Sequence, residues 1–71
     1  MQNKLAELRR AKDKSLIDIY HETSIPVYAA KAIERGIAQP EAHEVELLAN
    51  AYGLSEAELR EIVGMKEREG E

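Results

Sequence analysis

The chain has 71 residues, a formal net charge of -4 and no cysteine, which excludes a disulfide framework and a thiolate metal site. Its composition is 44% apolar and 34% charged, and no apolar run approaches the ~18 residues that a membrane span needs. Ala, Leu, Glu, Lys and Arg dominate, which favours an all-helical domain in a cytoplasmic protein or in a soluble fragment of a larger one.

Charge is distributed unevenly along the sequence. Residues 1–35 hold seven basic and five acidic side chains, whereas residues 36–71 hold three basic and nine acidic ones. An acidic whole argues mildly against nucleic acid, because phosphate binding depends on Lys and Arg. A ligand responds to the local face, however, and the N-terminal half is the basic one.

The N-terminal half predicts three short helices. A helical period covers residues 2–12, and Ser15 with Asp18 has the spacing of a capping box before a second helix at 16–22. That helix is expected to present Ile19 and Tyr20 inward. Pro26 then suits the first turn of a third helix that runs to Arg35.

The third helix is expected to end at Gly36, in the C′ position that favours a left-handed residue. Ala29, Ala30 and Ile33 form its predicted buried stripe. The small alanines would let this helix approach its neighbour closely.

Two more helices are predicted in the C-terminal half. Pro40 opens the fourth, Gly53 closes it, and its apolar stripe has helical spacing: Ala42, Val45, Leu48, Ala49 and Tyr52. Ser55 with Glu58 predicts a second capping box, which starts a fifth helix that ends at Gly64. The expected organisation is one domain over residues 1–64 and a polar, frayed tail over 65–71.

The segments LAELRRAKDKSLIDIYHETSIPVYAAKAIERG and AQPEAHEVELLANAYGLSEAEL together resemble the Cro/C1-type (XRE) helix-turn-helix family. The likeness covers about residues 5 to 62, including LRRAK, IERG, Pro40 and the LLANAYGL pattern. It implies a compact five-helix Cro/C1 fold. It also implies a sequence-specific DNA-binding regulator, a small repressor of phage or mobile-element type, that binds double-stranded DNA as a homodimer.

The resemblance also implies which residues contact DNA. The residues that would enter the major groove are Pro26, Val27, Tyr28 and Lys31. The residues that would contact the DNA backbone are Lys14, Ser15, Arg35 and the loop from Ile37 to Gln39. Leu16 occupies the place where the family often has a phosphate-binding Gln. The alternatives are that Lys14, Lys31 and Arg35 are solvated surface charges and that Tyr28 covers the turn before the third helix.

A second likeness concerns SLIDIYHETSIPVYAAKAIE, which is similar to the cytoplasmic helix-turn-helix domain of RodZ-type cell-shape proteins. Those proteins bind an actin-like filament. This likeness implies a protein-interaction module, a filament adaptor fragment or a partner of another regulator, as the alternative function. An acidic chain with few hydrogen-bonding groups on its third helix is the reason to keep it.

The Cro/C1 resemblance pairs Arg9 on the first helix with Glu34 at the end of the third. Because Glu34 follows the buried Ile33, an unpaired carboxylate there would be costly. We therefore expect a partly buried structural ion pair.

Some apolar residues do not fit the inward stripes, and they are expected either to form loose apolar surface or to contact a second copy in a homodimer: Leu47, Ile62, Val63 and Met65. His21 and His43 lack a carboxylate or cysteine partner at ligand spacing, so no metal site is expected. No cofactor, small-molecule ligand or catalytic constellation is predicted, and we do not expect an enzyme.

Overall fold

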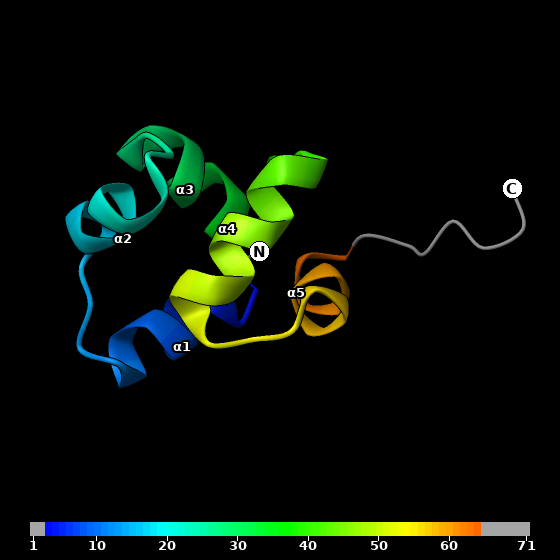
Figure 1. Cartoon of the computed structure of the whole chain (residues 1–71), viewed down its shortest axis with the longest axis horizontal. Coiled ribbons are helices and arrows are strands. Elements are labelled where there is room, and N and C mark those ends of the chain that lie inside the picture. The colour runs from blue at the N-terminus through cyan, green and yellow to red at the C-terminus, as the bar shows by residue number, and fades with distance from the viewer. Residues whose placement is uncertain (1–2, 65–71) are drawn as a thin grey trace, which may run out of the picture.

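A computed structural model describes residues 3–64, and within this range the chain is a compact helical globule without strands. Its five helices are α1 (Leu5–Ala11), α2 (Leu16–Thr23), α3 (Val27–Glu34), α4 (Ala42–Tyr52) and α5 (Glu56–Val63). The helix α4 lies at the centre and packs against α1, α2 and α5, while α3 packs against α2 (Figure 1). The expected all-helical fold with five helices is confirmed, and the predicted tail, 65–71, lies outside the described residues.

Local hydrogen bonds determine where two of the helices start. The Ser15 hydroxyl accepts from the Asp18 N–H at 3.1 Å, and the Asp18 carboxylate accepts from the Ser15 N–H at 2.8 Å. Ser55 and Glu58 form the same reciprocal pair at 3.1 and 2.9 Å. Both predicted capping boxes are therefore present, and each satisfies two backbone donors that a helix start leaves free.

Left-handed residues end the helices. Gly36, which follows α3, has a φ of 76°, and Gly53 after α4 has a φ of 73°. A glycine adopts this conformation without the steric cost that a Cβ atom would add. Gly64 has a φ of 82° after α5, so the three helix ends predicted at glycines are confirmed.

The core is formed by apolar side chains from all five helices and the turn before α3, listed by position: Leu5, Ile19, Ile25, Ala30, Ile33, Val45, Leu48, Ala49, Ala51, Tyr52, Leu59 and Val63. Leu8, Leu16, Ala29, Leu54 and Ile62 pack against it while partly exposed.

Two expectations for the core are wrong. Tyr20 is 45% exposed, because the inward stripe of α2 runs through Leu16, Ile19 and Thr23, and the residue after Ile19 points about 100° away from it. Ala42 is exposed at the start of α4, whereas Pro40, two residues before it, is buried.

The expected apolar surface near α5 is also largely absent. Val63 belongs to the core and Ile62 packs against it, because the last turn of α5 faces the rest of the globule. Leu47 does lie at the surface, with 37% of its area exposed. Met65 lies outside the described residues.

Candidate nucleic-acid interface

The turn between α2 and α3 is held by three hydrogen bonds. Ser24 adopts a left-handed conformation with φ 64°, and its N–H donates to the Tyr20 carbonyl at 2.7 Å. The Thr23 hydroxyl donates to the Ile19 carbonyl at 2.7 Å and accepts from the Ile25 N–H at 3.1 Å. Ile25 is buried, so the turn is anchored in the core. The start of α3 is therefore fixed relative to α2.

A buried ion pair joins the C-terminal end of α3 to α1, on the side of α3 that faces the core. The Arg9 guanidinium donates to the two oxygens of the Glu34 carboxylate, from Nε at 2.8 Å and from Nη2 at 3.1 Å. Only 11% of the Arg9 side chain and 5% of the Glu34 side chain are exposed. The structure thus contains the pair expected between α1 and α3.

Tyr52 completes this cluster and was expected only as an apolar member of the core. Its hydroxyl donates to Glu34 Oε2 at 2.7 Å from the last turn of α4. Burial, followed by the hydrogen bond to Glu34, raises the pKa of Tyr52, and the hydrogen bond to Glu34 raises the pKa of Arg9. A tyrosine in an otherwise aliphatic stripe was the available signal, since a buried hydroxyl needs a partner.

Asn3 ties the chain start to the same end of α3. Its side-chain N–H donates to the Ile33 carbonyl at 2.8 Å, and its backbone N–H donates to the Glu34 carbonyl at 2.9 Å. These bonds satisfy carbonyls that a helix end leaves free. The back of α3 is thus held by groups from α1, α4 and the N-terminal segment.

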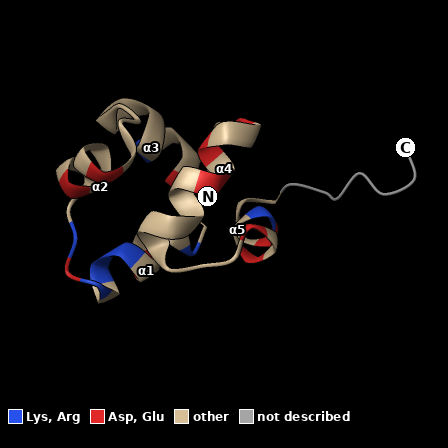
Figure 2. Cartoon of the chain, viewed as in Figure 1, with Lys and Arg blue, Asp and Glu red and all other residues tan. Residues whose placement is uncertain are grey.

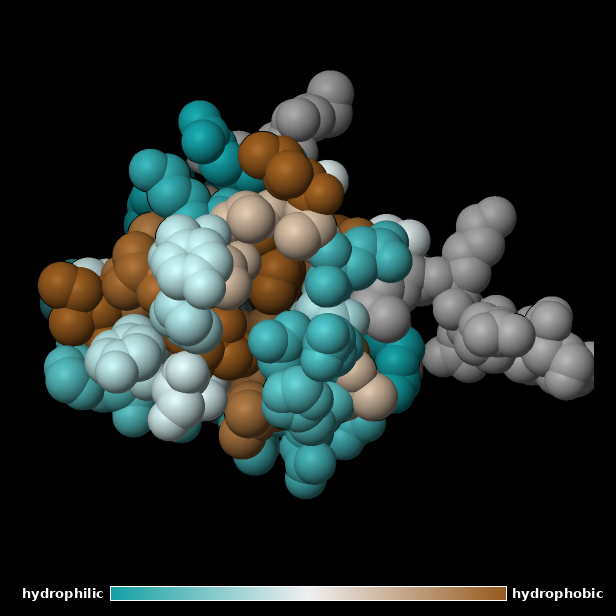
Figure 3. Space-filling view, turned by 90° about the horizontal axis from the view of Figure 1, so that it is seen from above, coloured by the Kyte–Doolittle hydropathy of each residue, from teal (hydrophilic) through white to brown (hydrophobic). Residues whose placement is uncertain are grey.

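The opposite edge of α3 is open to solvent. Tyr28 is 78% exposed, Pro26, Lys31 and Arg35 are exposed, and Val27 is half-buried. Seen from this side, apolar and weakly polar side chains cover much of the surface over α2 and α3, while hydrophilic ones gather over α4 (Figure 3). Among residues 3–64, Lys31 and Arg35 form no ion pair, so their charges face solvent.

Lys14 does not join this edge. Its ammonium group donates to Glu22 Oε1 at 2.9 Å and to the Ala51 carbonyl at 3.0 Å, so it links α2 to the C-terminal end of α4. A cation is favourable there because the C-terminal end of a helix carries the partial negative charge of the helix dipole. These bonds give Lys14 a structural role that the predicted phosphate contact did not include.

Ser15 and Leu16 also have local roles. The Ser15 hydroxyl and N–H are both used in the capping box, and hydrogen bonds from Ser15 lower the pKa of Asp18. The Asp18 carboxylate therefore places a negative charge at the start of α2, where the prediction expected a phosphate. Leu16 packs against the core.

The loop after α3 is exposed. Ile37 is 74% exposed, and Gln39 is exposed with one 3.5 Å hydrogen bond from Nε2 to the Gly64 carbonyl. Gly36 separates this loop from Arg35.

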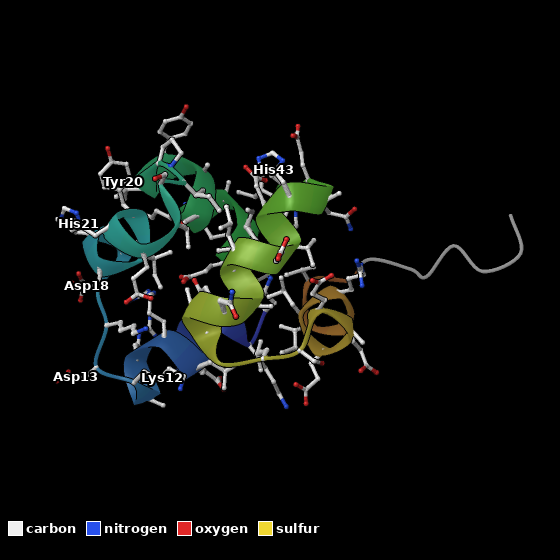
Figure 4. The ribbon with its side chains drawn as sticks, in the orientation of Figure 1. Lys12, Asp13, Asp18, Tyr20, His21 and His43 are labelled. Atoms are coloured by element: carbon white, nitrogen blue, oxygen red, sulfur yellow. The ribbon has the colours of Figure 1, made fainter. Side chains whose placement is uncertain are left out.

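The outward face of α2 was not singled out from the sequence. Ile17 is 59% exposed and Tyr20 45%, and Asp18, His21 and Glu22 lie beside them. Figure 4 shows Asp18, Tyr20 and His21 pointing away from the globule. Acidic positions mark the ribbon of α2, whereas basic positions mark the end of α1 and much of the following loop (Figure 2). The face of α2 is thus apolar and acidic, unlike the edge of α3.

An open polar hollow of about 410 Å³ lies between α1 and the start of α2, lined by Arg9, Arg10, Asp13, Lys14, Ser15 and Asp18. Arg9 and Lys14 are already paired with Glu34 and Glu22. The remaining Arg10 faces two carboxylates, so the hollow has no excess positive charge for an anion.

His21 and His43 lie on α2 and α4, well apart from each other (Figure 4). Within residues 3–64 no three His, Cys, Asp or Glu side chains are grouped so that they could hold a metal ion. None of the helices in this range combines the length and apolar character needed to cross a membrane.

Comparison with family models, with curated proteins and with solved structures found no match for this chain.

Proposed function

We propose that the protein is a sequence-specific DNA-binding regulator, a small repressor in which α2, the turn and α3 act as a helix-turn-helix of the Cro/C1 type. In this proposal α3 enters the major groove with its open edge toward the bases. Two short helices joined by a tight turn, with the second on the surface, fit this mode of binding. Repression then requires only that the protein occupies a promoter.

The observation that carries the proposal is the orientation of Glu34. It is the only carboxylate of α3, and it is turned inward to Arg9 and Tyr52. The open edge of α3 therefore keeps the two positive charges of Lys31 and Arg35 without a negative one. A local positive edge supports phosphate binding even where the whole chain is acidic.

The residues then divide into two roles. Pro26, Val27, Tyr28 and Lys31 face the groove, where Lys31 can reach a phosphate as well as a base, while Arg35 and Gln39 lie where the backbone passes. Lys14 and Leu16 are left out of the contact set because the Lys14 ammonium group is hydrogen-bonded to Glu22 and to the Ala51 carbonyl, and Leu16 packs against the core.

A homodimer on a palindromic operator remains part of the proposal, since one half-site gives a domain of this size little affinity. Two reading helices spaced about 34 Å apart would match successive major grooves. Leu47 is the exposed apolar residue available for the contact among the described residues of the predicted set.

Selection from a random pool of DNA duplexes tests the proposal. We expect an enriched palindrome, and binding that weakens steeply with salt. Lys31→Ala should lower the slope of log affinity against log salt concentration by about one for each protomer bound. Arg60→Ala on α5, where Arg60 pairs with Glu56, is the matched control and should leave the slope unchanged. Absence of any DNA binding at low salt would overturn the proposal.

A protein-interaction module is the second candidate, favoured by the exposed Ile17 and Tyr20 on α2. Apolar side chains next to acidic ones suit a protein partner better than phosphates. If DNA does not bind at low salt, this becomes the better account, and Ile17→Ser with Tyr20→Ser should then abolish partner binding without unfolding the domain.

A further inference from the structure

We infer that the α3 edge recognises its duplex through the C5-methyl groups of thymine, which project into the major groove beside Val27, Pro26 and the ring of Tyr28. This inference rests on the proposed DNA-binding function and specifies the base chemistry that the same site reads.

The first step is the chemistry of the exposed edge. From Pro26 to Ala30, the first turn and a half of α3 offers one hydrogen-bonding side-chain group, the Tyr28 hydroxyl, and Tyr28 is 78% exposed. Pairs of hydrogen bonds to adenine or guanine come from Asn, Gln, Arg or Lys. Within α3 only Lys31 has such a group, and it lies one turn beyond Tyr28.

The second step is the cost of a mismatch. An apolar side chain placed against the acceptor atoms of a purine removes water from them and gives no hydrogen bond in return. The same side chain placed against a thymine methyl buries apolar surface on both partners. Val27 and Pro26 therefore favour thymine and disfavour bases that present only polar atoms.

The third step is positioning. Val27 is half-buried, and the turn before it is fixed by the hydrogen bonds of Thr23 and Ser24. Its methyl groups are therefore held at one place on the edge. Lys31 and Arg35, one and two turns further along, supply the positive charge that attracts phosphates on the same side. The apolar start thus selects the base while the basic end increases the affinity.

The experiment uses the full chain and the duplex enriched from the random pool. Each thymine of the site is replaced in turn by deoxyuridine, which removes only the methyl group, and the dissociation constant is measured by fluorescence anisotropy at fixed salt. We expect one or two thymines in each half-site at which the affinity falls about fourfold, as burial of one methyl group predicts.

Variants assign the effect to the edge. In Val27→Ala, deoxyuridine at the sensitive thymine should cost less than twofold, because the partner of the methyl group has been removed. In Lys31→Ala, the affinity should fall both for the duplex with thymine and for the duplex with deoxyuridine, while the fourfold ratio between the two affinities remains. Circular dichroism tests whether each variant is folded. If Val27→Ala proves unstable, Tyr28→Phe is measured as well. This variant keeps the ring and should retain the fourfold ratio of affinities.

The outcomes distinguish failure of thymine-methyl recognition from failure of DNA binding itself. If deoxyuridine leaves the affinity unchanged at every thymine of the enriched sequence, recognition of thymine methyl groups is overturned while DNA binding remains supported. The assignment to this edge is overturned if the fourfold ratio persists in folded Val27→Ala and is also unchanged in Pro26→Ala and Tyr28→Ala. No binding to any duplex at low salt overturns the proposed function itself.

Discussion

Arg9 and Glu34 join the first helix to the end of the third through two hydrogen bonds, at 2.8 and 3.1 Å, in a site from which water is largely excluded. Arg9 also donates from Nη1 to the Lys14 carbonyl at 3.0 Å, so the same guanidinium fixes the turn that precedes α2. One side chain therefore sets the positions of both helices of the α2–α3 unit.

Arg9→Met should lower the free energy of unfolding by about 3 kcal/mol, because it leaves the Glu34 carboxylate buried with only Tyr52 as a partner. Urea unfolding followed by circular dichroism measures the change. Arg10→Met is the matched control: Arg10 is exposed on the same helix, and its change should stay within about 0.5 kcal/mol. Equal effects of the two substitutions would show that the pair does not brace α3.

Tyr52→Phe removes one hydrogen bond to a buried carboxylate and leaves no cavity, so a loss of about 1.5–3 kcal/mol is expected at pH 7. Because the folded pKa of Tyr52 is raised above 10.0, its contribution is complete below pH 10 and is lost as the pH rises further. The difference in stability between the unaltered protein and Tyr52→Phe should therefore narrow above pH 10. Tyr20→Phe, at an exposed position, should show no such difference.

The capping box of α2 predicts a dependence on acid pH. Hydrogen bonds from Ser15 lower the folded pKa of Asp18 below 3.8, so its contribution is present above pH 3.8 and is lost as the pH falls through the lower, folded value. Asp18→Asn should reduce the urea midpoint at pH 6, and the reduction should shrink as the pH falls below 3.8. Asp13→Asn changes a nearby exposed carboxylate and should leave the midpoint unchanged. A reduction by Asp18→Asn that is the same at pH 2 and pH 6 would contradict this account.

Features that depend on nearby residues could be predicted from the sequence. The Ser15–Asp18 and Ser55–Glu58 capping boxes join residues three apart, and Gly36 and Gly53 end helices through their own backbone conformation. Such signals need no knowledge of the tertiary structure. They account for the starts of α2 and α5 and for the ends of α3 and α4.

Features that depend on distant contacts could not be predicted in the same way. The partner of Lys14 is a carbonyl 37 residues away, and the burial of Val63 depends on how α5 packs against the centre of the globule. Tyr20 is exposed because the stripe that α2 buries passes through Ile19 and Thr23 instead. The Arg9–Glu34 pair, although 25 residues apart, was expected because a family resemblance supplied the contact.

The bonds of Lys14 yield a prediction that separates architecture from DNA binding. Lys14→Met should lower the free energy of unfolding by about 1 kcal/mol, since it removes hydrogen bonds to the Ala51 carbonyl and to Glu22. It should leave the salt dependence of DNA affinity unchanged at temperatures where the variant is fully folded, because this ammonium group faces α4 and not the α3 edge. Anisotropy titrations at two or more salt concentrations, paired with urea unfolding, measure both quantities. A salt slope reduced by about one for each protomer bound, with unaltered stability, would instead place Lys14 against a phosphate, and would mean that its internal hydrogen bonds are exchanged for that contact on binding.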